Sequence, residues 1–333
     1  MKIFLFLINL IFCLVSFSNI KIVTTLPNYS WLAKEIGREK VETKSIVLPD
    51  QDPHFVRAKP SFAFMLQKAD LFITTGLDLE LWVPALLDKA GNKNILEGEK
   101  GYCIVSEGVP LLEIPKAITR SAGDIHIFGN PHFYNSPIQL KIGSKNILNA
   151  LIRIDPKNGD YYKKNYEELI EKFNENLYGK ELLNYIDAEK LDSFVLNGNF
   201  WEKIKEMGLE EKVGGWLEKA KKLYKIKVLN YHKMWVYFCR TFGIEIKGQI
   251  EPKQGIPPSP KDVQKLINSI KNENVSLIFD TKYYRENQMK RISDSTKIPY
   301  AIVPAFVFDM STSSYFDLVD KILEILLDAL ERK

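Results

Sequence analysis

Four histidines are the residues of this sequence best suited to metal chemistry, because imidazole is the commonest protein ligand for borderline divalent metals. Two of them, His126 and His132, lie six residues apart in the turn-rich stretch GDIHIFGNPHFYNSP. The other two, His54 and His232, lie far from this stretch along the chain. A lone histidine is more often a surface or core residue, so a metal site requires a fold that brings several of them together.

Three of the histidines occupy comparable positions in the predicted secondary structure. His54 lies in the loop after the strand pattern VETKSIVL, His232 follows IKVLNY directly, and His132 lies just before a predicted helix. Ligands of open α/β sheets bind at the carboxyl ends of the strands. Zinc takes neutral imidazoles in a tetrahedral arrangement. These three residues therefore predict a metal site that favours zinc.

The elements that must position the histidines alternate between strand and helix patterns. This rhythm occurs twice and predicts mostly parallel sheets with helices on both faces. Between the two runs, YYKKNYEELIEKFNENLY carries an apolar stripe at helical spacing. We predict an α/β protein with an N-terminal lobe over residues 19–155, a linking helix over 156–180 and a C-terminal lobe over 181–333. Residues 182–215 show helical pieces without a strand.

The first 18 residues have the pattern of a secretion signal peptide, with Lys2 before an apolar run and small residues at the end. The alternative is an uncleaved anchor. Cys13 raises the further option of a lipid-modified cysteine, but the bulky Phe12 before it argues against a lipoprotein site. No later run of about 18 apolar residues predicts another membrane span.

Composition argues against nucleic acid as a partner and leaves two alternatives for the state of the cysteines. The formal net charge of +4 is small and no basic block is present, so we expect no nucleic-acid binding. Cys103 and Cys239 remain after removal of the signal peptide. They could pair outside the cytoplasm, but two cysteines form no disulfide framework, and two buried free thiols are equally plausible.

A set of motifs then occurs in the order of a known family: TTLPNYSWLAKEIG, the DPH loop, DLFITTGLDLELWVP, GNPHFYNSP, YHKMWVYFCRTFGIE, IPPSP and SYFDLVDKI. Over nearly the whole chain after the signal peptide, the sequence resembles the metal-binding solute receptors of ABC transporters of the ZnuA/TroA type. The resemblance implies two lobes bridged by a long rigid helix, with the metal in the cleft between them. It implies His54 and His132 as ligands from the first lobe and His232 from the second.

Two residues are candidates for the fourth ligand. The family often supplies an aspartate between the final strand and the terminal helix, and Asp309 in FVFDMSTSSYF is the candidate there. His126 is the rival, either as the alternative fourth ligand or as a loop histidine that passes metal inward. Glu251 and Asp280 also lie near strand ends of the second lobe, and we interpret them as structural charges.

The resemblance implies a high-affinity receptor that binds a divalent ion and delivers it to an ABC permease, and no enzyme activity. Zinc is the expected ion and manganese the alternative, since manganese prefers more oxygen ligands. We expect a monomer in the periplasm or at the outer face of the membrane, small lobe tilts on loading, and an affinity that falls below about pH 6.

The alternative function is a secreted zinc-dependent hydrolase, in which three histidines leave a fourth position open for water. The sequence contains no HExxH motif and no other pair of metal ligands on one helix, which argues against this alternative.

Overall fold

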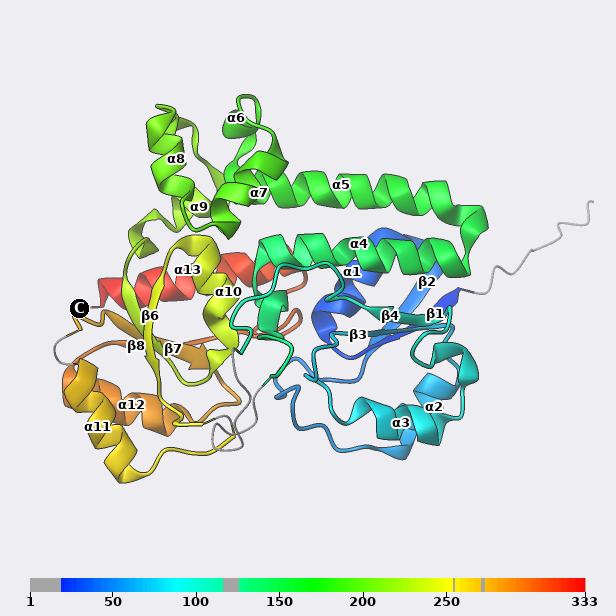
Figure 1. The fold of residues 1–333 in the computed structure, drawn as a ribbon, viewed down its shortest axis with the longest axis horizontal. Helices are drawn as coiled ribbons and strands as arrows, with labels where there is room; N and C mark the ends of the chain where they lie inside the picture. Colours follow the sequence, from blue (N-terminus) through cyan, green and yellow to red (C-terminus); the bar gives the residue numbers. More distant parts are fainter. Residues whose placement is uncertain (1–18, 116–125, 254, 271–272, 333) are drawn as a thin grey trace, which may run out of the picture.

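Two four-stranded parallel sheets form the centres of two α/β lobes (Figure 1). The computed structural model describes residues 19–115, 126–253, 255–270 and 273–332. The predicted signal peptide, with Cys13, lies outside these residues. Among the described residues, no helix is both long and apolar enough to cross a membrane. The predicted two-lobe α/β fold is confirmed.

The N-terminal lobe has the strand order β2-β1-β3-β4, and all its strand pairs are parallel. Every residue of the central strand β3 is buried, as expected for a strand with helices on both faces. Figure 1 shows α1 and α4 on one side of the sheet and α2 and α3 on the other. The elements are β1 (Ile20–Thr24), α1 (Pro27–Gly37), β2 (Val41–Ser45), α2 (Pro60–Gln67), β3 (Leu71–Thr74), α3 (Val83–Ala90), β4 (Tyr102–Ile104) and α4 (Pro137–Ile154).

The C-terminal lobe repeats this plan with the strand order β6-β5-β7-β8, again all parallel. Successive residues of its central strands point to opposite faces. Val228 and Phe279 belong to the main core, whereas Leu229 and Ile278 pack in a second core with α11 and α12. The elements are β5 (Lys227–Asn230), α10 (Val236–Phe242), β6 (Glu245–Gln249), α11 (Pro260–Ile270), β7 (Leu277–Thr281), α12 (Glu286–Thr296), β8 (Tyr300–Val303) and α13 (Tyr315–Glu331).

A helix of 20 residues, α5 (Gly159–Tyr178), runs beside α4 along one side of the molecule (Figure 1). At 1.5 Å per residue its length is about 30 Å. Its buried residues include Tyr162, Leu169, Phe173 and Leu177, which lie on the stripe that the sequence predicts. The helix therefore forms because one apolar face is buried against α1 and α4.

Four short helices connect α5 to β5 and project above the C-terminal lobe in Figure 1. They are α6 (Lys180–Leu183), α7 (Ala188–Leu196), α8 (Phe200–Glu206) and α9 (Gly215–Lys219). The described residues 182–215 contain no strand, in agreement with their sequence pattern.

The two lobes share one continuous hydrophobic core, which includes side chains of both central sheets. The C-terminal helix α13 contributes to it, because Tyr315 stacks on Trp31 of α1 with ring centroids 6.1 Å apart. Buried hydrogen bonds also cross between the lobes: Val307 N donates to Asn28 Oδ1 at 2.9 Å and Tyr315 Oη to Tyr134 O at 3.1 Å. The linking helix is thus one of several connections that hold the lobes together.

Cys103 on β4 and Cys239 on α10 are both buried and are not disulfide-bonded. Burial raises the pKa of the Cys103 thiol to about 12, which keeps it protonated and unreactive at neutral pH. The structure therefore favours two buried free thiols over a pair.

Candidate metal centre

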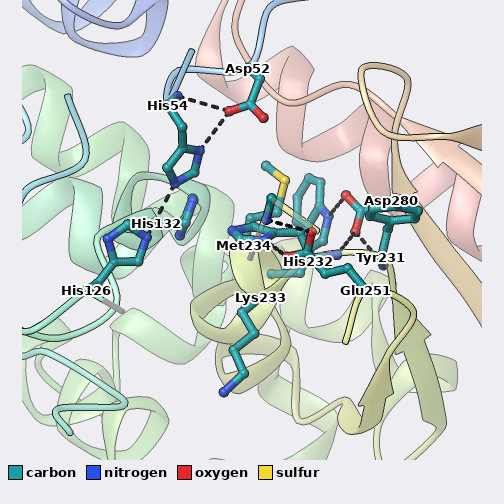
Figure 2. A network of polar contacts seen from close by, with 12 residues as sticks. Asp52, His54, His126, His132, Tyr231, His232, Lys233, Met234, Glu251 and Asp280 are labelled. Carbon is teal, nitrogen blue, oxygen red and sulfur yellow. Dashed lines mark hydrogen bonds and ion pairs between the residues drawn. The ribbon is translucent and has the colours of Figure 1, made fainter. Parts of the chain in front are cut away.

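The four histidines of the sequence converge on one point between the lobes (Figure 2). His54 lies in the loop between β2 and α2, and His126 and His132 lie in the segment before α4. His232 is the second residue after β5. One ring nitrogen from each histidine lies within 4.8 Å of those from the other three. A single ion can therefore contact all four rings.

The four rings approach one another closely, and those of His54 and His126 are stacked with their centroids 5.4 Å apart. The His132 and His232 ring centroids are 5.0 Å apart, and His54 Nε2 lies 3.3 Å from His126 Nε2. Nε2 of His132 and Nε2 of His232 are buried and have no hydrogen-bond partner among the described residues. A buried polar atom without a partner is costly. An ion between the rings would satisfy both nitrogens.

Two of the histidines are held by the same local turn. In Asp52-Pro53-His54, Asp52 Oδ1 accepts from His54 N at 3.0 Å and from His54 Nδ1 at 2.7 Å. In Asn130-Pro131-His132, Asn130 Oδ1 accepts from His132 N at 3.0 Å and from His132 Nδ1 at 2.9 Å. Because Nδ1 carries the proton in both turns, Nε2 presents its lone pair to the centre.

His232 is held by two acids of its own lobe. Its Nδ1 donates to Oε1 of Glu251, which follows β6. Asp280 of β7 accepts from His232 N at 3.0 Å and from Tyr231 N at 2.7 Å, and Trp235 Nε1 also donates to it at 2.9 Å. Burial raises the pKa of Asp280 to about 7, although these hydrogen bonds lower it in part. Asp280 therefore orders the loop, and Glu251 orients the ring.

Burial keeps two of the imidazoles neutral. Together with the nearby His54 and His232, burial lowers the pKa of His126 to about 3. Burial also lowers the pKa of His132 well below its usual value, with added contributions from His232, His54 and His126. A neutral imidazole is the form that binds a metal, so both side chains are in the state that ligation needs.

The structure does not bring Asp309 into this group of ligand atoms. Asp309 is buried in the loop before α13, and its Oδ1 accepts from Lys282 Nζ at 2.8 Å. His126 lies with the other three histidines instead. The turn-rich stretch with two histidines therefore places both of them at the centre.

The sequence did not lead us to predict the contacts that hold the histidine rings. Asp52 and Asn130 were detectable, since DPH and NPH are two copies of an Asx-Pro-His pattern, and Asx side chains bond to backbone N–H two residues on. Glu251 and Asp280, interpreted as structural charges, both bond to His232. Sequence separations of 19 and 48 residues hide these two contacts.

Comparison with known proteins shows the family of this chain. The family model described as zinc-uptake complex component A, periplasmic (ZnuA), matches residues 22–179 and 208–329. The chain belongs to the ZnuA family. It is a metal-binding solute receptor of an ABC transporter and not an enzyme, so the expected receptor function is confirmed and the hydrolase alternative is not favoured.

Individual relatives of this ZnuA-family receptor agree with the assignment. The manganese ABC transporter substrate-binding lipoprotein PsaA of Streptococcus pneumoniae is 26% identical over 288 residues, which cover 85% of this chain and 79% of PsaA. A crystal structure of ZnuA superposes with a TM-score of 0.68 at 18% identity and covers 94% of this chain and all of that one, 100%. FpvC of Pseudomonas aeruginosa in complex with Mn²⁺ gives a TM-score of 0.69 at 18% identity, with coverage of 95% and 99%.

The family model leaves residues 180–207 unmatched. This gap covers α6, α7 and α8, which belong to the helical segment that connects α5 to β5. All four histidines lie within the residues that the family model matches.

Proposed function

We propose that this receptor carries zinc and that His54, His126, His132 and His232 are its four ligands. The observation that supports this is the all-nitrogen donor set: the four rings share one point, and no carboxylate among the described residues joins that group. Nitrogen donors suit zinc, whereas manganese prefers oxygen. PsaA and FpvC are named for manganese or bind it, and the oxygen ligands that manganese prefers are absent from this group of described residues.

X-ray absorption of the zinc-loaded protein tests the ligand set directly. We expect four nitrogen neighbours at about 2.0–2.1 Å, all with the scattering pattern of imidazole. His126→Ala should reduce the number of imidazoles to three and weaken zinc binding. Asp309→Asn, the matched control, should leave all four in place. If the Asp309 change altered the coordination shell and the His126 change did not, the four-histidine site would be wrong.

The identity of the cargo needs a measurement that does not depend on affinity rank, since nearly all sites bind zinc more tightly than manganese. Uptake of zinc and of manganese is therefore measured separately, with each ion supplied without the other, in cells with and without the gene. Loss of the gene should reduce zinc uptake and leave manganese uptake unchanged. Reduced manganese uptake with unchanged zinc uptake would overturn the proposal.

We further propose that the loaded receptor acts in the periplasm or at the outer face of the membrane and delivers the ion to an ABC permease as a monomer. Support comes from the apolar N-terminal pattern and from the relatives, which are substrate-binding lipoproteins of such transporters. Deletion of the gene should reduce zinc uptake, and a copy with His132→Ala should fail to restore it. Uptake restored by that copy would contradict the proposal.

A further inference from the structure

The acceptors of the three described Nδ1 hydrogen bonds differ in charge. His54 and His232 donate to carboxylates, Asp52 and Glu251, whereas His132 donates to the amide oxygen of Asn130. Each carboxylate is therefore one imidazole ring away from the point that the Nε2 atoms share. Figure 2 shows Asp52 behind His54 and Glu251 behind His232, on different sides of the cluster.

An ion at this point has no counter-charge in its own donor set, because the four imidazoles are neutral when they bind a metal. A buried charge without compensation is strongly unfavourable. Lys233, next to His232, pairs with Glu113, and Lys282, which follows β7, pairs with Asp309. Asp52 and Glu251 are the carboxylates that accept a hydrogen bond from a ligand ring.

We propose that Asp52 and Glu251 are positioning residues that also determine charge selectivity: they orient the rings of His54 and His232, and together they supply two negative charges that favour a divalent over a monovalent cation. This inference rests on the proposed function, since it requires the four histidines to hold the ion. Asn130 provides the same orientation for His132 without a charge.

Charge and orientation make different quantitative predictions. Coulomb energy is proportional to the charge of the ion. Loss of one carboxylate charge should therefore change the logarithm of the affinity twice as much for Zn²⁺ as for Cu⁺. Outer partners of ligating histidines typically contribute about 10–100-fold in metal affinity. The corresponding loss for Cu⁺ would be about 3–10-fold. A misoriented ring, by contrast, lowers the affinities for Zn²⁺ and Cu⁺ by the same factor.

Asp52→Asn is a clean substitution because the second turn shows that it fits. Asn130 makes the same two hydrogen bonds to His132 that Asp52 makes to His54. The variant therefore removes a charge and keeps the geometry. Glu251→Gln is the second variant, but Gly255 N also donates to Glu251 Oε2 at 3.3 Å, so this change disturbs one backbone contact.

The experiment measures Zn²⁺ and Cu⁺ affinities by competition with chromophoric chelators, with Cu⁺ kept reduced under nitrogen. Wild type is compared with Asp52→Asn, Glu251→Gln, Asn130→Ala and the exposed control Glu211→Gln, after circular dichroism has confirmed folding. We expect both carboxylate variants to lose Zn²⁺ affinity by about 10–100-fold and Cu⁺ affinity by about the square root of that factor. Asn130→Ala should lower the affinities for both ions by the same factor. Glu211→Gln should change neither affinity.

Equal losses of Zn²⁺ and Cu⁺ affinity in Asp52→Asn would overturn the charge role, and so would unchanged Zn²⁺ affinity. If Glu251→Gln fails to fold, Asp52→Asn alone decides the outcome. A wild-type receptor without affinity for zinc would instead overturn the proposed function, and this inference with it.

Discussion

The two Asx-Pro-His turns share a local geometry but differ in their surroundings. Asp52 keeps 20% of its side chain exposed, and a contact of its turn, from Trp82 Nε1 to Pro53 O at 2.8 Å, stays within the N-terminal lobe. Asn130 is 4% exposed, and its Nδ2 donates to Lys233 O of the other lobe at 2.8 Å. One turn thus bonds a carboxylate to a histidine of the cluster, and the other joins the lobes.

The difference explains the choice of side chain in each turn. Asn130 must be an amide because its Nδ2 is also a donor to Glu113 Oε2, at 2.9 Å. An aspartate there would face a carboxylate and a carbonyl without a proton to share. Asp52 only accepts in the contacts that hold His54, so an acid fits. Where a side chain needs only to accept, the sequence is free to add a charge.

The largest effect should come from removal of either turn's histidine. We expect His54→Ala and His132→Ala each to weaken zinc binding by more than about 100-fold. Loss of a residue that only holds a ligand costs up to about 100-fold, and each of these changes removes a ligand itself. Calorimetric zinc titration measures this. If one of the two variants retained wild-type affinity, only the other turn would serve the metal.

Exchange of the two Asx residues should affect stability unequally. Asn130→Asp removes two buried donors and places a carboxylate beside Glu113, so we expect a loss of about 3 kcal/mol in the free energy of unfolding. Asp52→Asn should change it by less than about 1 kcal/mol. Urea unfolding of the metal-free variants compares them. Equal losses would show that the two turns differ less than their contacts indicate.

Acidification should destabilise the metal-free protein through the buried histidines. The pKa of His132 and that of His126 lie below the usual value in the folded state, so below about pH 6.5 the unfolded chain binds more protons and stability falls. Each group contributes at most about 1.4 kcal/mol per pH unit.

Two buried acids oppose this trend. The histidine contribution must therefore be measured as a difference in stability between wild type and a histidine variant. Burial raises the pKa of Asp280 to about 7 and also raises that of Glu80. The folded state therefore takes up protons at these two groups before the unfolded chain does, and this uptake increases the free energy of unfolding as the pH falls. The stability difference between wild type and His126→Ala from about pH 7 to pH 5 isolates the histidine contribution. A difference that stays constant with pH would contradict the prediction.

The smallest change should be in overall shape. Tyr237 Oη donates to Asn130 O at 2.6 Å and accepts from Leu112 N at 2.9 Å, so hydrogen bonds of the protein itself join the NPH turn to the C-terminal lobe. We expect X-ray scattering curves of metal-free and zinc-loaded protein to superimpose. A large compaction on loading would contradict a preformed cleft.

Much of the fold and part of the site followed from local sequence patterns. Alternating strand and helix patterns predicted the parallel sheets, because hydrophobic periodicity reflects local geometry. The positions of His54 and His232 after strands predicted that each lies at the ligand-binding edge of its own sheet. That the two edges face one another across the lobes was implied only by the family resemblance. The apolar stripe from Tyr162 to Leu177 likewise predicted α5.

Tertiary structure alone decided the remaining features. The sequence left Asp309 and His126 as rivals, and only the packing of the loops places His126 beside His54 and pairs Asp309 with Lys282. The bond from His232 to Glu251 joins two separate strand ends. Periodicity reports which face of an element is buried, whereas these contacts depend on how elements distant in sequence are arranged around the shared core.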